Sequence, residues 1–288
     1  MRCLVLGAGG FLGGHVRARL DADPGVTVEA ADRSRADLLG GGLDELLRQA
    51  APDVVVNCAG VTGGDEVAMA RGNVVAVANL LAALDRLPKQ ARLVHLGSAA
   101  EYGVVPPGLP VTESQAAHPV SAYGMSKLAG TELVLAARRR GRDATVLRIF
   151  NPLGPGTPET LLPGRLVAVL RRAASTGERA RVGSLDGHRD FVDARDVASA
   201  IRAVALSEKP LPGVLNVGSG RATALRELAA MAAVVVGVAP PLEDAAGSAR
   251  SPSVTWQQAD ITAAIAALGW RPSFAPADSI RDMILVPA

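Results

Sequence analysis

The sequence has few cysteines and few aromatic residues. Of 288 residues, two are cysteine, Cys3 and Cys58, and 3% are aromatic. Two cysteines are too few for the disulfide framework of a small secreted protein, so both are expected to be reduced core residues. Because rings are scarce, the core must be built from aliphatic side chains and alanine, and apolar residues make up 49% of the chain. This composition predicts a globular protein with a large aliphatic core.

An excess of charge of either sign is also absent. The 30 Lys and Arg residues nearly balance the 28 Asp and Glu residues, which leaves a formal net charge of +2. Proteins that bind nucleic acids or acidic surfaces usually concentrate positive charge. The balance therefore argues against a nucleic-acid partner.

Long apolar runs are missing too. A membrane-spanning helix needs roughly 18 or more apolar residues, whereas the apolar run Met231–Ala239 ends at Pro240. The first residues lead directly into glycines and lack the pattern of a signal peptide. We therefore expect a cytoplasmic protein with no membrane partner.

The N-terminal stretch MRCLVLGAGGFLGG carries the pattern around which the chain is organised. Arg2–Leu6 is a nearly continuous apolar run, typical of a strand buried on both faces of a parallel sheet, and Phe11–Leu20 has helical periodicity. Glycines in the turn between them allow a phosphate to approach the backbone and the helix N-terminus. A glycine-rich turn without a ligand is the alternative, but a position between strand and helix favours nucleotide binding. The expected cofactor contacts are Gly7, Gly10, Phe11, Leu12 and Gly13.

The end of the second predicted strand, Val26–Ala31, bears on which cofactor is used. Asp32 follows this strand, where an acidic side chain accepts hydrogen bonds from the adenosine ribose of NAD. Arg33 and Arg35 come next, and a guanidinium there could bind the 2′-phosphate of NADP. NAD(H) and NADP(H) both stay open, with a slight preference for NAD. Asp37 and Leu38 are placed at the adenine ring.

Further strands and helices alternate along the chain. Asp53–Cys58 and Arg92–Leu96 are buried strands on either side of a long helix, Glu66–Arg86. Four strands alternating with helices predict an α/β fold, a Rossmann-like doubly wound parallel sheet. Small residues after the third strand allow the backbone to lie against the cofactor, although an ordinary turn has the same composition. We assign Cys58, Ala59, Gly60 and Asn73 to the cofactor site.

Candidate catalytic residues follow the fourth strand. Ser98 lies at the carboxyl end of the sheet, where ligands bind in such folds, although a serine there is more often a turn residue. A helix that opens with Ser121 carries Tyr123 and Lys127 four residues apart on one face. The chain has 2 Tyr and three Lys, so this pairing is informative. A packed tyrosine beside a solvated lysine is the alternative.

These three side chains suit one reaction. A phenol with a pKa of about 10 is a poor proton donor or acceptor near neutrality, and a nearby ammonium lowers that pKa. Tyr123 is then the acid or base, Lys127 holds the nicotinamide ribose, and Ser98 hydrogen-bonds the substrate oxygen. The predicted reaction is interconversion of a carbonyl and an alcohol by hydride transfer.

With the motifs GAGGFLG, GSAAEYG, YGMSK, LRIFNPLGPG and HRDFVDARDVASA, the chain resembles the extended short-chain dehydrogenase/reductases, the NAD-dependent epimerase/dehydratase family acting on nucleotide sugars. The resemblance implies a nucleotide-sugar substrate and a homodimer, and no metal site is expected. It implies catalytic roles for Ser98, Tyr123 and Lys127. By the same resemblance, Phe150 joins the cofactor site, and Ser98, Ala99, Asn151, Arg189 and Arg250 bind substrate.

Within that family, the motifs look most like the GDP-6-deoxy-4-keto-mannose reductases and related 4-ketoreductases. The 4,6-dehydratases carry acidic residues directly after the catalytic Ser or Thr, whereas this chain has Ala99 and Ala100. Glu101 is displaced by one position and is not assumed to replace them. An epimerase with tightly bound NAD uses the same residues and is the alternative. A non-catalytic nucleotide-sensing or scaffold protein is the alternative of another class.

The predicted domains interleave along the chain. Residues 1–154 and 185–219 are expected to form the NAD(P)-binding domain, with a fifth strand at Ala144–Ile149. Residues 155–184 and 220–288 are expected to form a smaller, mostly C-terminal substrate-binding lobe.

Overall fold

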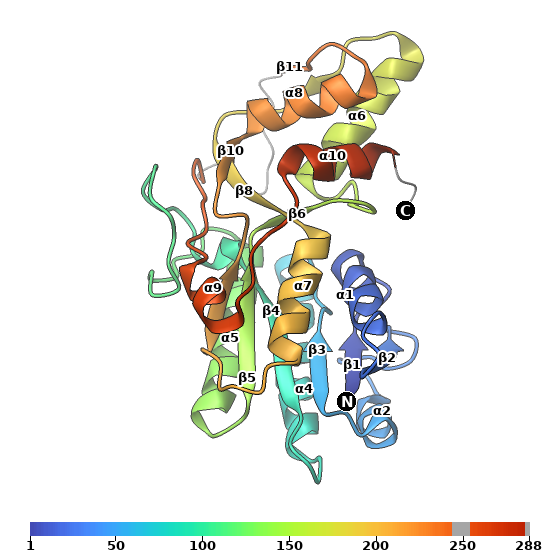
Figure 1. Ribbon diagram of the computed structural model, residues 1–288, viewed down its shortest axis with the longest axis vertical. Helices are drawn as coiled ribbons and strands as arrows, with labels where there is room; N and C mark the ends of the chain where they lie inside the picture. Colours follow the sequence, from blue (N-terminus) through green and yellow to red (C-terminus); the bar gives the residue numbers. More distant parts are fainter. Residues whose placement is uncertain (244–253, 286–288) are drawn as a thin grey trace.

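The computed structural model describes residues 1–243 and 254–285 and is built on a six-stranded parallel sheet (Figure 1). The strand order is β2-β1-β3-β4-β5-β9, and every neighbouring pair is parallel. The predicted doubly wound parallel sheet is therefore confirmed. The strands are β1 (Arg2–Leu6), β2 (Thr27–Ala31), β3 (Val54–Asn57), β4 (Arg92–Ser98), β5 (Ala144–Ile149) and β9 (Val214–Val217).

The chain reverses its direction of winding between β1 and β3. β2 pairs with one edge of β1, and β3 then pairs with the other. In sheets of this type, ligands bind outside the carboxyl ends of the strands at this reversal.

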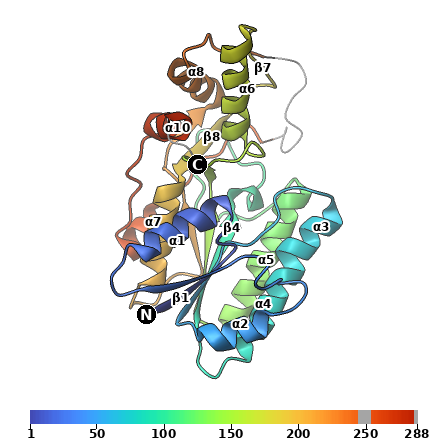
Figure 2. The same cartoon turned by 90° about the vertical axis from the view of Figure 1, so that its right-hand side faces the viewer.

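Helices cover both faces of the sheet, as Figure 2 shows. On one face, α1 (Phe11–Asp21) and α7 (Ala194–Ala205) pack over a core that includes Val5, Val56 and Leu215. On the other face lie α2 (Leu43–Ala50), α4 (Ala76–Asp85) and α5 (Ala122–Arg139). Alternate strand residues therefore enter opposite cores, which explains why these strands are apolar at nearly every position.

A second group of elements lies beyond the carboxyl ends of the strands, at the top of Figure 1. Its core includes Leu153, Leu170, Phe191, Leu228 and Ile280. The helices are α6 (Leu162–Thr176), α8 (Leu225–Val236) and α10 (Pro276–Leu285), and α9 (Thr262–Leu268) lies lower, beside β9. The strands are β6 (Asn151–Leu153), β8 (His188–Asp193) and β10 (Ala222–Ala224), which form one sheet, and β7 (Arg181–Val182) and β11 (Leu242–Glu243), which form another.

β8 connects the two cores. It pairs with β6 and β10 rather than with the six-stranded sheet, although it falls in the segment 185–219 that we expect in the NAD(P)-binding domain. Its side chains alternate, because Phe191 enters the upper core and Val192 enters the lower one. The predicted domain boundaries stay a prediction.

The predicted continuous helix Glu66–Arg86 is interrupted. It consists of α3 (Glu66–Ala70), a π-helical turn at Arg71–Val75, and α4. The amide of Asn73 inside this turn accepts from Val61 N and donates to Val61 O, both at 2.8 Å. Such turns often occur at functional sites, and this one brings Asn73 to the edge of the cavity described below.

The combined helix Glu66–Asp85 is also long and apolar enough to cross a membrane, with a mean hydropathy of 1.6 over an 18-residue window. The segment contains no long uninterrupted apolar run, since Arg71, Asn73 and Asn79 divide it. Its side chains Val77, Leu80 and Leu84 are buried in the core between the sheet and the helices. Core helices of globular proteins can have the same length and hydropathy, so this helix is weak evidence for a membrane span.

Candidate active site

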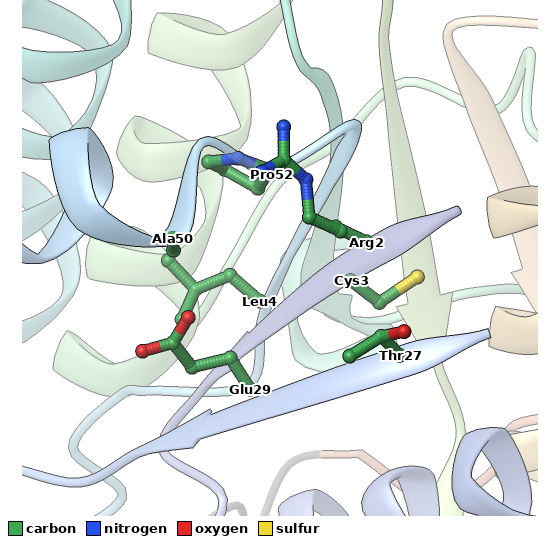
Figure 3. Close-up of a pocket in the computed structure, with 7 residues that line it drawn as sticks. All are labelled: Arg2, Cys3, Leu4, Thr27, Glu29, Ala50 and Pro52. Carbon is green, nitrogen blue, oxygen red and sulfur yellow. The ribbon is translucent and has the colours of Figure 1, made fainter.

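A cavity of about 1200 Å³ lies at the carboxyl ends of β1, β3, β4 and β5, below the second group of elements. This volume exceeds the range of about 300–1,000 Å³ that is typical of pockets for drug-sized ligands. A much smaller cavity of about 40 Å³ lies at the opposite end of β1, around Arg2, Thr27 and Glu29 (Figure 3). The predicted site residues on the large cavity are Gly10, Phe11, Leu12, Gly13, Cys58, Ala59, Gly60, Asn73, Ser98, Ala99, Tyr123, Lys127, Phe150, Asn151 and Arg189.

The glycine turn after β1 is closely packed. Gly7 has a φ of +74°, and a β-carbon built on it would lie 2.7 Å from Ala59 N. Gly7 itself does not line the cavity and so supports the turn from behind. Gly10 caps α1 without a side chain that could accept from the first-turn N–H groups. An anion in the cavity could therefore accept from them.

The residues predicted at the adenosine end, Asp32, Arg33, Asp37 and Leu38, lie outside the lining of the cavity. Asp32 Oδ1 accepts from the hydroxyl of Ser34 at 2.6 Å and from its N–H at 2.9 Å. Both bonds lower the pKa of Asp32, and the bond from the hydroxyl has the larger effect. Asp32 is also close to the glycine turn, because a β-carbon on Gly9 would lie 3.9 Å from its Cβ.

The two arginines after Asp32 have different surroundings. Arg35 turns back along β2, where it forms an ion pair with Glu29 and donates to Ala30 O. Arg33 has a 75% exposed side chain and lies 3.6 Å from a carboxylate oxygen of Asp37. Of the two guanidiniums, that of Arg33 is therefore the less constrained.

Tyr123 and Lys127 share the cavity with Ser98, as the spacing predicts. Their helix begins at Ser121, whose hydroxyl accepts from Gly124 N at 3.1 Å. A β-carbon on Gly124 would lie 2.5 Å from Ala100 O, so α5 packs directly against the segment that follows Ser98. Lys127 is buried rather than solvated, and its ammonium donates to Leu96 O.

Electrostatics at Lys127 are set by opposing effects. Burial lowers the pKa of Lys127, whereas the charge of Glu101, and to a lesser extent Cys58, raises it. Burial also raises the pKa of Cys58 to about 12 and lowers the pKa of His95 well below its usual value. Glu101 is therefore the important negative charge near this ammonium.

Ser98 ends β4, two residues beyond the predicted end of that strand, and caps the short 3₁₀ helix Ala99–Glu101. Its Oγ accepts from Ala100 N at 3.2 Å, and its N–H donates to Glu101 Oε1 at 2.7 Å. The serine is thus held from both sides, with its hydroxyl at the cavity.

Two predicted substrate residues, Asn151 and Arg189, also line the cavity. Asn151 Nδ2 donates to Asp190 O at 3.0 Å. Arg189 donates to Val254 O at 2.6 Å, and burial lowers its pKa. Among the residues that the structure describes, no carboxylate forms an ion pair with Arg189. Arg250, the other predicted arginine, lies outside the described residues.

Some residues of the site were not predicted. Gln257 lines the cavity and donates to Ala99 O at 3.3 Å, and its Oε1 lies 3.4 Å from Asn151 Nδ2. It comes from the C-terminal part of the chain, where no motif marks it. Ser126 also contacts the site indirectly, because it accepts from Asn73 Nδ2 at 3.0 Å. In the described part of the chain, no cluster of His, Cys, Asp and Glu could hold a metal ion.

Comparison with known proteins gives concordant results. Residues 3–218 match the NAD dependent epimerase/dehydratase family. The chain is 36% identical to dTDP-6-deoxy-L-talose 4-dehydrogenase (NAD(P)(+)) of Kitasatospora kifunensis, over 98% of this chain and 94% of that protein. It is 30% identical to GDP-6-deoxy-D-mannose reductase of Pseudomonas aeruginosa, over 98% of this chain and 96% of that protein. The solved structure of RMD from Pseudomonas aeruginosa with NADPH matches with a TM-score of 0.87 and 28% identity, over 98% of this chain and 97% of that one.

Proposed function

Since the chain belongs to the NAD-dependent epimerase/dehydratase family, we propose that it is an NAD(P)H-dependent ketoreductase of a nucleotide-linked 4-keto-6-deoxy sugar. Two relatives similar over nearly the whole chain are named as a deoxysugar 4-dehydrogenase and a deoxysugar reductase. The first name gives a dehydrogenase that uses NAD(P), and the second gives a reductase, so both describe redox chemistry on a nucleotide-linked deoxysugar. One relative is named with NAD(P) and one similar solved structure contains NADPH, so the proposal includes both cofactors.

The observation that carries this proposal is the meeting of Ser98, Tyr123 and Lys127 in the same cavity as the glycine turn. The cavity fits a dinucleotide, because the first turn of α1 opens into it and Gly60 provides a surface without a side chain. Lys127 and Asn73 both lie within 4 Å of where a β-carbon on Gly60 would be. A larger residue there would crowd both of them.

When bound beside Tyr123 and Lys127, a reduced nicotinamide would supply the hydride for the carbonyl carbon. Tyr123 transfers its phenolic proton to the carbonyl oxygen, so the ketone becomes an alcohol and the tyrosine is later reprotonated by solvent. Lys127 supplies positive charge that stabilises the phenolate. The hydroxyl of Ser98 donates to the same carbonyl oxygen and stabilises negative charge as it develops.

Elimination of water is disfavoured at this site. Ala99 and Ala100 provide no acid or base beside Ser98, and Glu101 is buried in an ion pair with Arg148 at 2.8 Å. Its carboxylate is therefore engaged away from the substrate. These contacts support a reductase over a dehydratase.

For the nucleotide sugar, we assign the diphosphate to Arg189 and the sugar to Asn151. Arg189 is a half-buried guanidinium at the cavity that forms no ion pair with the described carboxylates, and phosphate oxygens are suitable acceptors for it. Ser98 and Ala99 complete the sugar end.

We also propose that the protein is a homodimer formed through α4 and α5. Both helices lie on one face of the sheet, and apolar side chains at or beside them are exposed, including Val75 at 45% and Met125 at 56%. Sedimentation of the wild type and of Met125→Glu tests this assignment. A monomeric wild type contradicts it.

The function is tested by incubating the purified protein with NADH or NADPH and a panel of 4-keto-6-deoxy sugar nucleotides. We expect loss of reduced-nicotinamide absorbance with at least one member. Tyr123→Phe should lower the rate by about 10²–10⁴-fold, the usual contribution of a general acid, while cofactor binding persists. Unchanged turnover in Tyr123→Phe would show that another group supplies the proton.

An epimerase is the second candidate, because the matching family includes epimerases and the same side chains suit both reactions. An epimerase oxidises and re-reduces one carbon with a cofactor that it retains. Co-purified NAD, with interconversion of two sugar nucleotides and no net change in nicotinamide, would favour it.

A further inference from the structure

Glu101 is a buried carboxylate directly behind the active site, with no exposed surface. Its Oε1 accepts from Ser98 N at 2.7 Å and from the hydroxyl of Thr131 at 3.0 Å, and its Oε2 accepts from Arg148 Nε at 2.8 Å. These donors come from β4, α5 and β5. Burying a charge is costly unless it is paired and hydrogen-bonded, so the site is built around this carboxylate.

Glu101 fixes Ser98 through a reciprocal capping arrangement. The Glu101 carboxylate binds the N–H of Ser98, while Ser98 Oγ accepts from the N–H of Ala100. This backbone donor uses one lone pair of the serine oxygen and leaves its O–H available to donate to a ligand. Gly97 makes room for the carboxylate, since a β-carbon there would lie 2.7 Å from Glu101 Oε1.

Glu101 also lies beside Lys127, because its carboxylate accepts from Thr131, which is one helical turn after Lys127 on α5. The pKa of Lys127 is lowered by burial, and Glu101 is the stronger of the two groups that oppose this effect. Arg148 holds the carboxylate in place and stacks 4.5 Å over the ring of Tyr102. The titratable groups around Glu101 and Lys127 come from several elements. They are Cys58 after β3, His95 on β4, Tyr102 after the 3₁₀ helix, Tyr123 on α5 and Arg148 on β5.

We propose that Glu101 is a positioning residue: it fixes Ser98 at the cavity, where the serine hydroxyl meets the substrate oxygen, and places a negative charge beside Lys127. The proposal rests on the proposed function for the roles of Ser98 and Lys127. Glu101 itself does not line the cavity and acts through these two residues.

Glu101→Gln keeps an oxygen for the Ser98 N–H but removes the negative charge. Loss of that charge favours the deprotonated forms of nearby groups, so the alkaline limb of the reduction rate should move to lower pH by about one unit. Glu101→Leu removes the acceptor as well and should lower kcat on the order of 10–100-fold, with KM for the cofactor unchanged. If the alkaline limb of the pH profile stays in place in Glu101→Gln, the electrostatic role is wrong. If kcat is unchanged in Glu101→Leu, the positioning role is wrong.

Matched variants separate these effects from loss of packing. Thr131→Val removes a hydrogen bond to the same carboxylate oxygen without changing charge, so its alkaline limb should stay in place. Glu101→Gln with Arg148→Met removes both charges and avoids an unpaired buried guanidinium. If Glu101→Gln alone does not fold, this double variant should fold and still show a limb displaced to lower pH, because the charge of Glu101, and not that of Arg148, raises the pKa of Lys127. If the alkaline limb of Thr131→Val moves as far as that of Glu101→Gln, the proposal is contradicted.

A titration without substrate distinguishes this proposal from the proposed function. The chain has 2 Tyr, so tyrosinate absorbance reports on few groups. The transition lost in Tyr123→Phe belongs to Tyr123, and Glu101→Gln should move its midpoint down by about one pH unit. A protein that shows this shift but reduces no sugar nucleotide would contradict the proposed function alone. A protein that reduces the sugar without this shift would contradict the role of Glu101 alone.

Discussion

The α-carbon of Gly13 lies so close to Gly7 that a β-carbon on Gly13 would be 2.0 Å from the carbonyl oxygen of Gly7. This contact sets α1 against the turn after β1 and fixes the N–H groups of the first helical turn. It explains the need for glycine at position 13 by packing alone, without a ligand.

Gly13→Ala should therefore displace α1, lower the free energy of unfolding by about 1–3 kcal/mol and weaken NAD(P)H binding. Gly14→Ala is the matched control, because its β-carbon would meet only Ala8 O, at 3.9 Å. Denaturant unfolding and cofactor fluorescence measure both effects. Equal affinity for the cofactor in the two variants would show that this contact does not shape the site.

Asp32 should influence the choice between NADH and NADPH. Hydrogen bonds hold the pKa of Asp32 below its usual value, and the bond from the Ser34 hydroxyl contributes most. The Asp32 carboxylate is therefore negative near neutrality. Asp32→Asn removes a charge that would repel a 2′-phosphate and should raise the ratio of kcat/KM for NADPH over NADH by about tenfold.

Asp44→Asn is the control for this experiment, since it removes an exposed charge that pairs with Arg86 and is not among the predicted cofactor contacts. A similar change of preference in both variants would indicate a general effect of surface charge. Glu29→Gln adds a further comparison, because it releases Arg35 from its ion pair beside the small cavity of Figure 3.

Arg189 should act on the nucleotide sugar and not on the cofactor. Arg189→Ala is expected to raise KM for the sugar nucleotide by about 10–100-fold, the effect of losing a charge-assisted hydrogen bond worth roughly 1.5–3 kcal/mol. Arg221→Ala is the control, because Arg221 has a 69% exposed side chain and pairs weakly with Glu227 at 3.6 Å. An increase in KM for NAD(P)H instead would place the cofactor phosphates at Arg189.

Asp190 should make stability depend on pH. Burial raises its pKa to about 6, although backbone N–H groups of Ala259, Ser219 and Gly220 and the Ser219 hydroxyl donate to it. Between its unfolded value of about 3.9 and about 6, the folded state binds more protons than the unfolded state. The contribution of Asp190 to stability therefore falls as pH rises through this range and is constant above about pH 7.

This dependence is measured as the difference in unfolding free energy between the wild type and Asp190→Asn. The wild type should lose stability relative to Asp190→Asn as pH rises from 4 to 6, by an amount on the order of 2–3 kcal/mol. Since Asp190→Asn also loses hydrogen bonds, only the slope against pH is diagnostic. A flat difference would mean that this carboxylate has an ordinary pKa in the folded protein.

Local patterns in the sequence were sufficient for the sheet and for much of the cavity. The strand Asp53–Cys58 was predicted within one residue at each end, because its side chains are buried on both faces. Ser98, Tyr123 and Lys127 share a cavity because one follows a strand end and the others lie on one helix face. Their roles in catalysis, like the cofactor contacts, stay predictions.

What could not be predicted depends on distant contacts. The π-helical turn at Arg71–Val75 accompanies hydrogen bonds between Asn73 and Val61, and a β-carbon on Gly72 would clash with the side chain of Val61. The environment of Glu101 depends on Arg148, 47 residues away in the chain. Gln257 reaches the cavity from 158 residues beyond Ala99. No local pattern contains these pairings.

The alternation of β8 has a consequence for how the molecule unfolds. Phe191 and Val192 are adjacent in the chain, yet each belongs to a different apolar core. Melting either core would pull this strand out of the other, so the two halves lose their structure together. We therefore expect the two cores, and the cavity between them, to be lost in the same transition on heating.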